Sequence, residues 1–177
     1  EALRQLSYLQ QTCGFQYLRF HGLFSDDMAV CTLDRAGNVL YNWQYVDLVI
    51  DQMLSLHIRP LVELGFMPDC LKSGGQTIFW WKGNVTPPKD MNQWHELVSA
   101  FTRHVTGRYG AEEVRQWYFE VWNEPNLSGF FAGTQQQYFE LYDASADAVK
   151  AVDPAYRVGG PGTAGIAEGT WIAELIA

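Results

Sequence analysis

The chain has 177 residues and a formal net charge of 12 − 20 = −8, and hydrophobic residues make up 47% of it. This apolar content is typical of a folded globular protein and excludes a disordered chain. The acidic balance argues against nucleic acid or an anionic membrane as a partner, because both bind clustered Lys and Arg. No apolar run approaches the roughly 18 residues of a membrane span. No targeting segment is visible, so the localisation stays unknown.

Helical and strand patterns alternate along the whole chain. Apolar spacing and strand-forming runs predict, in chain order, a helix at 2–13, a strand at 15–21, a helix at 46–54, a strand at 59–66, a helix at 94–105 with Gly110 as its cap, a strand at 116–122, a helix from the capping box at 134–137 through 152, a strand at 156–160 and a helix at 171–177. No linker divides the pattern, so we expect one domain.

Strict alternation predicts a parallel α/β sheet with crossover helices. Such sheets are either open and doubly wound or closed as an eight-stranded (β/α)8 barrel. The strand centres lie 43, 58 and 39 residues apart, which suits a barrel with long loops after its strands. Eight units of this size need roughly 360 residues, so the chain would hold about half of a barrel.

The segment at 69–89 is long for a loop and is rich in glycine, proline and tryptophan. A loop of this length in a compact domain is usually functional or disordered. Trp80 and Trp81 are adjacent, and neighbouring residues on a strand cannot both face one core. One of the two is therefore predicted to line a surface or a cleft.

The three cysteines are Cys13, Cys31 and Cys70. Their spacing matches no zinc motif, and an odd number does not suggest a disulfide framework. All three are therefore interpreted as structural thiols. The four histidines form no H-E-x-x-H pair, so no metal site and no cofactor is predicted.

Chemistry in a parallel sheet gathers at the carboxyl ends of its strands, and the end of the 116–122 strand is the most informative. Glu124 directly precedes a proline there and lies among Trp122, Asn123 and Asn126. An aromatic wall can desolvate a carboxyl group and make it a general acid, and an asparagine beside it can bind a sugar hydroxyl. The alternative is that Glu124 caps the loop or pairs with an arginine.

Other polar residues near strand ends have competing interpretations. Glu120 lies deeper in its strand and is expected to be structural, with Arg19 as its partner. Glu63 could equally support the site or the fold, and His21 could equally donate to a substrate or be a satisfied core histidine. The remaining candidates are expected to be turn, cap, surface or packing residues: Asp26, Asp27, His57, His95 and His104.

The segment 160–165 formally fits the dinucleotide motif G-x-G-x-x-G. That motif must open directly into a helix, with an acidic residue about 20 positions later. Here the next helix is predicted only near Trp171, and Pro161 removes a backbone donor. A nucleotide site is therefore the least favoured interpretation.

Together with several longer stretches, the residues around Glu124 resemble glycoside hydrolase family 39, the β-xylosidase and α-L-iduronidase family among the barrel glycosidases. The matching stretches are RFHGLFSDDM (19–28), YNWQYVD (41–47), RPLVELGFMP (59–68), FWWKGNVTPPKD (79–90), RYGAEEVRQWYFEVWNEPNL (108–127) and RVGGPGTAG (157–165). They are collinear over nearly the whole chain, and the block at 83–90 is more similar to the β-xylosidase branch.

The resemblance implies a retaining enzyme that acts on a glycoside such as a xylo-oligosaccharide. Glu124 would be the general acid/base at the end of the fourth barrel strand, and Asn123 would bind the sugar 2-hydroxyl. His21, Trp81 and Phe130 would shape the sugar pocket.

The family's nucleophile is a glutamate on the seventh strand, whereas the strands counted here correspond to about strands 2 to 5. Residues 1–177 are thus expected to form a partial barrel without the first strand and the C-terminal strands, and no nucleophile is assigned. The alternative from another class is a carbohydrate-binding barrel that has lost catalysis.

Overall fold

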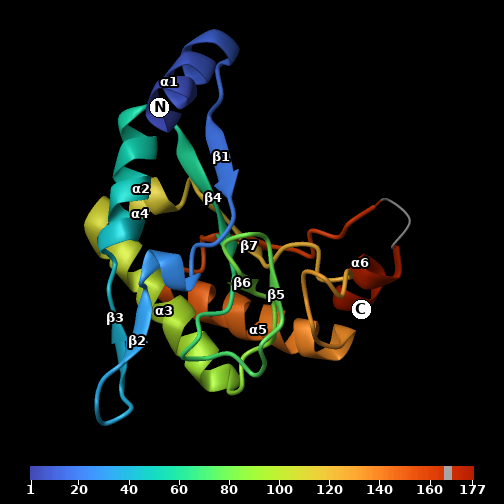
Figure 1. Ribbon diagram of the computed structural model, residues 1–177. Helices are drawn as coiled ribbons and strands as arrows, with labels where there is room; N and C mark the ends of the chain where they lie inside the picture. The colour runs from blue at the N-terminus through green and yellow to red at the C-terminus, as the bar shows by residue number, and fades with distance from the viewer. Residues whose placement is uncertain (166–168) are drawn as a thin grey trace.

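Four short strands form one parallel sheet in this computed structural model, which describes residues 1–165 and 169–177. In spatial order they are β1 (Tyr17–Phe20), β4 (Arg59–Leu64), β7 (Tyr118–Val121) and β8 (Arg157–Gly159). Sequential strands are neighbours, and every pair is parallel. The predicted parallel α/β sheet is therefore confirmed (Figure 1).

Helices connect these strands, as the alternating pattern predicts. They are α1 (Ala2–Cys13), α2 (Gln44–Ser55), α3 (Met91–Tyr109), α4 (Ala111–Val114), α5 (Gln135–Val152) and α6 (Gly169–Leu175). The capping box is present, since the Thr134 hydroxyl accepts from Gln137 N and the Gln137 side chain accepts from Thr134 N. Gly110 ends α3 with φ of 86°, a left-handed conformation that favours glycine.

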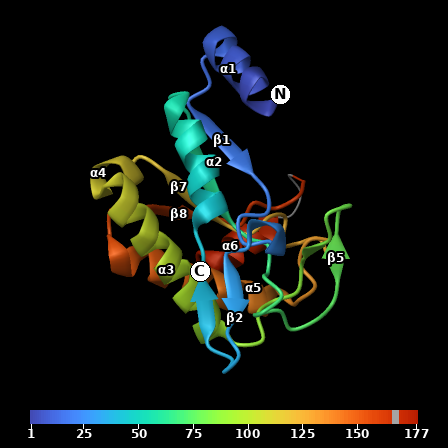
Figure 2. The same ribbon diagram turned by 60° about the vertical axis from the view of Figure 1, so that its left-hand side comes forward.

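The two faces of the sheet have different partners. Alternate strand residues Val62, Leu64, Phe119 and Val121 are buried against the helices, because successive side chains of a strand point to opposite faces. Helices α3 and α5 pack against each other on that side, and Figures 1 and 2 show them lying together. The main apolar core is thus the layer between the sheet and these helices.

Two small hairpins lie in the loops that follow β1 and β4. The first consists of β2 (Cys31–Leu33) and β3 (Val39–Tyr41), preceded by the 3-10 turn η1 (Asp26–Met28). The second consists of β5 (Thr77–Ile78) and β6 (Gly83–Asn84) and lies within the long segment at 69–89. Sequence patterns predicted neither hairpin, because strands of two or three residues are too short to show an alternation.

A disulfide joins Cys31 to Cys70, so the interpretation of these two cysteines as thiols is wrong. They are 39 residues apart in sequence. The topology explains the pairing: β1 and β4 are parallel neighbours, so the loops that follow them leave the same edge of the sheet. Cys13 is a free, exposed thiol. Within the described part of the chain, no helix has the length and hydropathy to cross a membrane.

Candidate active site

The carboxyl ends of β1, β4 and β7 bring four predicted residues to one edge of the sheet. His21 directly follows β1, Glu63 is the penultimate residue of β4, and Asn123 and Glu124 follow β7. The register places Glu63 opposite Glu120, and Glu120 opposite Gly159. Because parallel strands present their carboxyl ends together, these residues converge although they are up to about a hundred positions apart.

The backbone after β7 turns sharply to present Glu124. Trp122 and Glu124 have φ of 66° and 42°, a left-handed conformation that costs non-glycine residues on the order of 1–3 kcal/mol each. The buried Trp122 indole anchors the turn, since its Nε1 donates to the Phe130 carbonyl at 2.6 Å. Such strain persists only where the surroundings over-determine the conformation, and it concentrates at functional sites.

The loop after β8 supports the Glu124 loop from the other side. Glu124 N donates to the Gly162 carbonyl at 2.9 Å. Asn126 makes a reciprocal pair with Ala164, donating to its carbonyl at 3.1 Å and accepting from its amide at 2.8 Å. The glycine-rich segment at 160–165 therefore braces the Glu124 loop, and helix α6 begins only at Gly169.

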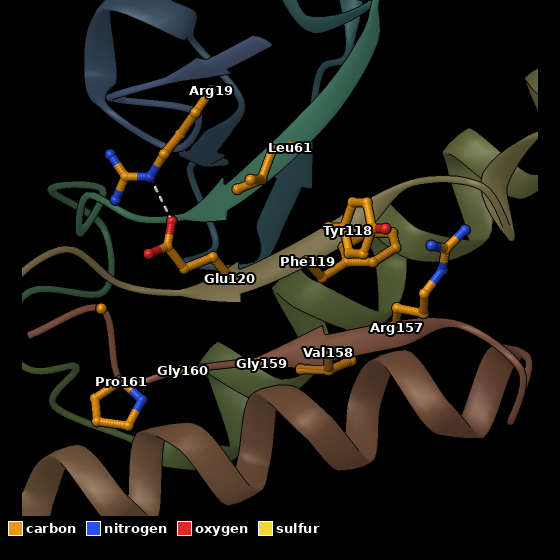
Figure 3. Close-up of a pocket in the computed structure, with 11 residues that line it drawn as sticks. Arg19, Leu61, Tyr118, Phe119, Glu120, Arg157, Val158, Gly159, Gly160 and Pro161 are labelled. Carbon is orange, nitrogen blue, oxygen red and sulfur yellow. Dashed lines mark hydrogen bonds and ion pairs between the residues drawn. The ribbon is translucent and has the colours of Figure 1, made fainter. Parts of the chain in front are cut away.

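Arg19 is the central cation of this edge. Its Nε donates to Glu120 in a short contact, as Figure 3 shows, and its Nη2 lies 2.8 Å from Glu63 Oε2. The same Nη2 donates to Asn123 Oδ1 at 2.9 Å. The predicted pairing of Glu120 with Arg19 is confirmed, but sequence reasoning missed that Arg19 also contacts Glu63 and Asn123.

Electrostatics keep Arg19 charged. Burial alone lowers the pKa of Arg19, but its hydrogen bond to Glu120 and the charges of three nearby glutamates outweigh burial. The pKa of the guanidinium is therefore raised above its ordinary value. The single guanidinium of Arg19 thus contacts two carboxylates and one amide.

Glu63 is the most deeply buried of these carboxyl groups, with a side chain that is 0% exposed. Its Oε2 lies 2.7 Å from His21 Nδ1 as well as next to Arg19. Its Oε1 is buried and has no hydrogen-bond partner among the described residues. Glu63 therefore lies in the site rather than in the apolar core, although its sequence position left both possibilities open.

Aromatic rings line the same edge. The His21 ring stacks on Phe79, with centroids 5.8 Å apart and planes at 26°. Phe79 in turn stacks on Trp81 and meets Phe130 edge-on at 5.6 Å. The predicted pocket residues His21, Trp81 and Phe130 thus belong to one cluster. Phe79 was missed, although it directly precedes the Trp80–Trp81 pair in the sequence.

The two adjacent tryptophans have different surroundings. Trp80 is 90% exposed, whereas Trp81 is partly buried and lines a cavity of about 130 Å³ together with His21, Gly22, Ser25, Asp27 and Met28. Trp81 also borders a cavity of about 300 Å³ that contains Asp26, Asp69 and Lys72. The prediction that one member of the pair lines a cleft or surface is confirmed.

A larger cavity, of about 550 Å³, lies on the sheet face that the helices leave uncovered. Figure 3 shows Arg19 and Glu120 at one end of it and Tyr118 and Arg157 at the other. Glu124 and Asn123 do not line it. In a closed barrel this face points inward, so we interpret this cavity as barrel interior rather than as the candidate site.

Two of the other candidates, His95 and His104, pair with aspartates of neighbouring helices. His95 pairs with Asp147 at 2.9 Å and His104 with Asp47 at 2.6 Å, both between helices. Asp26 belongs to η1, and its side chain accepts from Asp69 N at 3.1 Å. Among the described residues, no group of three or more His, Cys, Asp or Glu side chains could hold a metal ion.

Comparison with known proteins agrees with this geometry. The family model of glycosyl hydrolases family 39 matches residues 1–177. A β-xylosidase of Geobacillus stearothermophilus is 49% identical over 99% of the chain, which spans 36% of that relative. The human α-L-iduronidase is 34% identical over 84% of the chain, which spans 21% of it.

Solved structures give the same answer. The crystal structure of the family 39 enzyme from Xanthomonas axonopodis pv. citri superposes with a TM-score of 0.93 and is 48% identical. The match covers 98% of this chain and 34% of that one. The four-stranded sheet is therefore part of a (β/α)8 barrel, and the chain spans about a third of its β-xylosidase relatives. The chain belongs to glycosyl hydrolases family 39.

Proposed function

We propose that the full-length protein that contains this chain is a retaining β-xylosidase that releases xylose from xylo-oligosaccharides or related glycosides. The observation that carries the proposal is the placement of Glu124. It stands at the carboxyl end of β7 on a strained, braced turn, beside an asparagine that an arginine holds. The higher identity to a β-xylosidase than to an iduronidase supports the substrate class.

Glu124 is proposed as the general acid/base. As an acid it would protonate the leaving glycosidic oxygen, and as a base it would then deprotonate the attacking water. The two hydrogen bonds of its own backbone, to Gly162 and from Leu127, fix the turn from which the side chain projects. A fixed carboxyl group loses less freedom when the sugar binds, which favours proton transfer.

Asn123 is proposed to bind the sugar 2-hydroxyl. Its side chain is buried, and Arg19 donates to its Oδ1. Because an arginine can only donate, this contact fixes the amide orientation and directs its NH2 group away from Arg19. That NH2 group can donate to the sugar, an interaction that strengthens as positive charge develops at the anomeric carbon.

His21, Trp81 and Phe130 are proposed to shape the sugar pocket. Trp81 and Phe130 both contact the Phe79 ring, and His21 stacks on it. Aromatic faces bind the apolar faces of sugar rings, while an imidazole nitrogen can bind a hydroxyl. No cofactor enters this mechanism.

A retaining mechanism needs a second carboxyl group about 5 to 5.5 Å from the first. We assign no nucleophile within residues 1–177 and propose that it lies on a later barrel strand. On this view the chain contributes barrel strands 2 to 5, and the remaining strands complete the pocket.

The experiment compares Glu124→Gln with the unaltered full-length protein on aryl β-xylosides of graded leaving-group ability. Glutamine cannot protonate the leaving oxygen, so poor leaving groups should be cleaved about 10²- to 10⁴-fold more slowly. Activated nitrophenyl xylosides need little protonation and should be slowed much less in the bond-breaking step.

Glu140→Gln is the matched control, because Glu140 is an exposed glutamate on α5. This substitution should leave all rates unchanged. Equal slowing of all substrates by Glu124→Gln would remove Glu124 from the acid role. Xyloside binding without any hydrolysis by the unaltered protein would support the carbohydrate-binding alternative instead.

A further inference from the structure

The buried carboxyl group of Glu63 has a geometry that its burial alone does not explain. A carboxylate withdrawn from water is costly unless it is paired. Glu63 is paired twice through the same oxygen: Arg19 Nη2 lies 2.8 Å from Oε2, and His21 Nδ1 lies 2.7 Å from it. The positive charge of Arg19 compensates a buried carboxylate, and the same oxygen faces the imidazole.

This contact determines which nitrogen of His21 holds a proton. A carboxylate can only accept hydrogen bonds, so Nδ1 must be the donor in the 2.7 Å contact. In a neutral imidazole the other nitrogen, Nε2, is then an acceptor. Phe79 against the ring face and Phe66 against its edge, both with centroids at 5.8 Å, restrict rotation of the ring.

We propose that Glu63 is a positioning residue that holds His21 in the Nδ1–H tautomer, so that Nε2 accepts a hydrogen bond from a sugar hydroxyl. This replaces the expectation that His21 donates to the substrate, because the neutral ring has its only proton on the side of Glu63. The assignment rests on the proposed function for its role in turnover, but the tautomer itself does not depend on activity.

Arg19 links this unit to the rest of the site. The guanidinium that orients Glu63 also donates to Asn123 Oδ1 at 2.9 Å and contacts Glu120. One cation thus orients the asparagine directly and the histidine through Glu63. The two polar groups proposed to bind the sugar are therefore oriented by the same arginine.

The first test reads the tautomer directly in the full-length protein labelled with ¹⁵N-histidine. Long-range ¹H–¹⁵N spectra at a pH where the ring is neutral should show His21 protonated at Nδ1, with the signal assigned by its loss in His21→Ala. His104 is an internal control, since its Nε2 contacts Asp47 Oδ1 at 2.6 Å and should have the opposite tautomer. An Nε2–H tautomer for His21 in the unaltered protein would overturn the proposal without any variant at Glu63.

The second test compares Glu63→Ala with the conservative Glu63→Gln. Alanine leaves Nδ1 without an acceptor, whereas glutamine can keep its amide oxygen at the position of Oε2, which contacts both Arg19 and His21. The Nδ1–H signal of His21 should weaken in Glu63→Ala and persist in Glu63→Gln, while His104 stays unchanged in both. The kcat/KM of Glu63→Ala on nitrophenyl β-xyloside should fall about 10- to 100-fold, by analogy with carboxylates that orient metal-bound histidines.

A double-mutant cycle separates positioning from a general structural role. In a His21→Ala background, Glu63→Ala should change kcat/KM by less than about 3-fold, because the residue through which Glu63 acts is gone. If the kcat/KM losses of the two single variants multiply in the double variant, the proposal is overturned. Glu113→Gln breaks a glutamate–arginine pair at the other end of β4 and should leave both the spectrum and kcat/KM unchanged. If the unaltered protein proves inactive on glycosides, the proposed function fails and the tautomer still decides the role of Glu63.

Discussion

Two arginines on neighbouring strands show how the two ends of the sheet differ. At the amino end of β4, Arg59 meets a single carboxylate, donating to Glu113 Oε1 at 2.8 Å and to Oε2 at 3.1 Å. At the carboxyl end, Arg19 is shared by Glu63, Glu120 and the amide of Asn123. The first is a closed pair of one cation and one anion, whereas the second leaves negative charge in excess.

This difference separates a contact that supports the fold from one that supports chemistry. Both carboxylate oxygens of Glu113 accept hydrogen bonds, since Arg59 donates to each and Trp117 Nε1 also donates to Oε1 at 3.0 Å. Glu63 keeps one buried oxygen without a partner among the described residues. A carboxyl end with unbalanced charge and strained backbone is less stable than it could be, and such sites are where function is retained at a cost in stability.

The largest expected effect comes from Arg19→Met in the full-length protein. The substitution leaves Glu63 buried without its cation, and breaking a buried pair in this way costs about 3–5 kcal/mol. We expect about 3 kcal/mol, because Arg19 is 31% exposed. Hydrolysis of xylosides should be lost as well, since Asn123 and Glu63 lose their orientation. Chemical denaturation and aryl-xyloside assays measure the two effects.

Arg59→Met is the control for that substitution. Both side chains of its pair are partly exposed, at 33% and 26%, and such pairs contribute about 1 kcal/mol or less. Its kcat/KM should be unchanged. Equal losses of stability and activity in the two variants would show that the two ends of the sheet do not differ as described.

A smaller effect is expected from Gly83→Ala, which crowds the aromatic cluster. A Cβ at position 83 would lie 2.3 Å from Trp81 Cζ3 and 3.1 Å from Phe66 Cδ1, so Trp81 must move. Overpacking of this kind costs about 1–3 kcal/mol, and KM for xylosides should rise. Gly107→Ala in α3 has nothing within 4 Å and should stabilise the helix by about 0.5–1 kcal/mol. An unchanged KM in Gly83→Ala would remove Trp81 from the pocket.

The smallest expected effect is on stability and its pH dependence, and it comes from the Arg59–Glu113 pair. Burial raises the pKa of Glu113, but hydrogen bonds from Arg59 and Trp117 outweigh burial, so its pKa is lowered below the ordinary 4.5. A lowered folded-state pKa gives stability that is present above the ordinary value and is lost as the pH falls through the lowered one. Glu113→Gln should therefore cost under about 1 kcal/mol near neutral pH and progressively less in acid. A cost that does not change with pH would contradict the ion pair.

Sequence patterns predicted the parts of the molecule that depend on local periodicity. The order of helices and strands, the capping box at Thr134 and the position of Asn123 and Glu124 after the carboxyl end of β7 all follow from spacing and strand direction. The partnership of Arg19 with Glu120 also followed, because a charge inside a sheet needs an opposite charge.

Features that depend on contacts between loops were not predicted. The Cys31–Cys70 disulfide joins two loops whose approach is set by the order of β1 and β4, and the spacing of the cysteines contains no such information. The stack of Phe79 on His21 likewise joins two loops. The sharing of Arg19 between Glu63 and Asn123 needs distances that only the folded sheet provides.

The brace between the loops after β7 and β8 has a consequence for exchanging parts between relatives. Asn126 and Ala164 are 38 residues apart, yet each satisfies the other, and Gly162 holds the amide of Glu124. A chimera cut between α5 and β8 would separate the acid/base loop from the segment that holds its shape. A functional exchange unit must instead run past Ala164, so the smallest transferable module is longer than one strand and one helix.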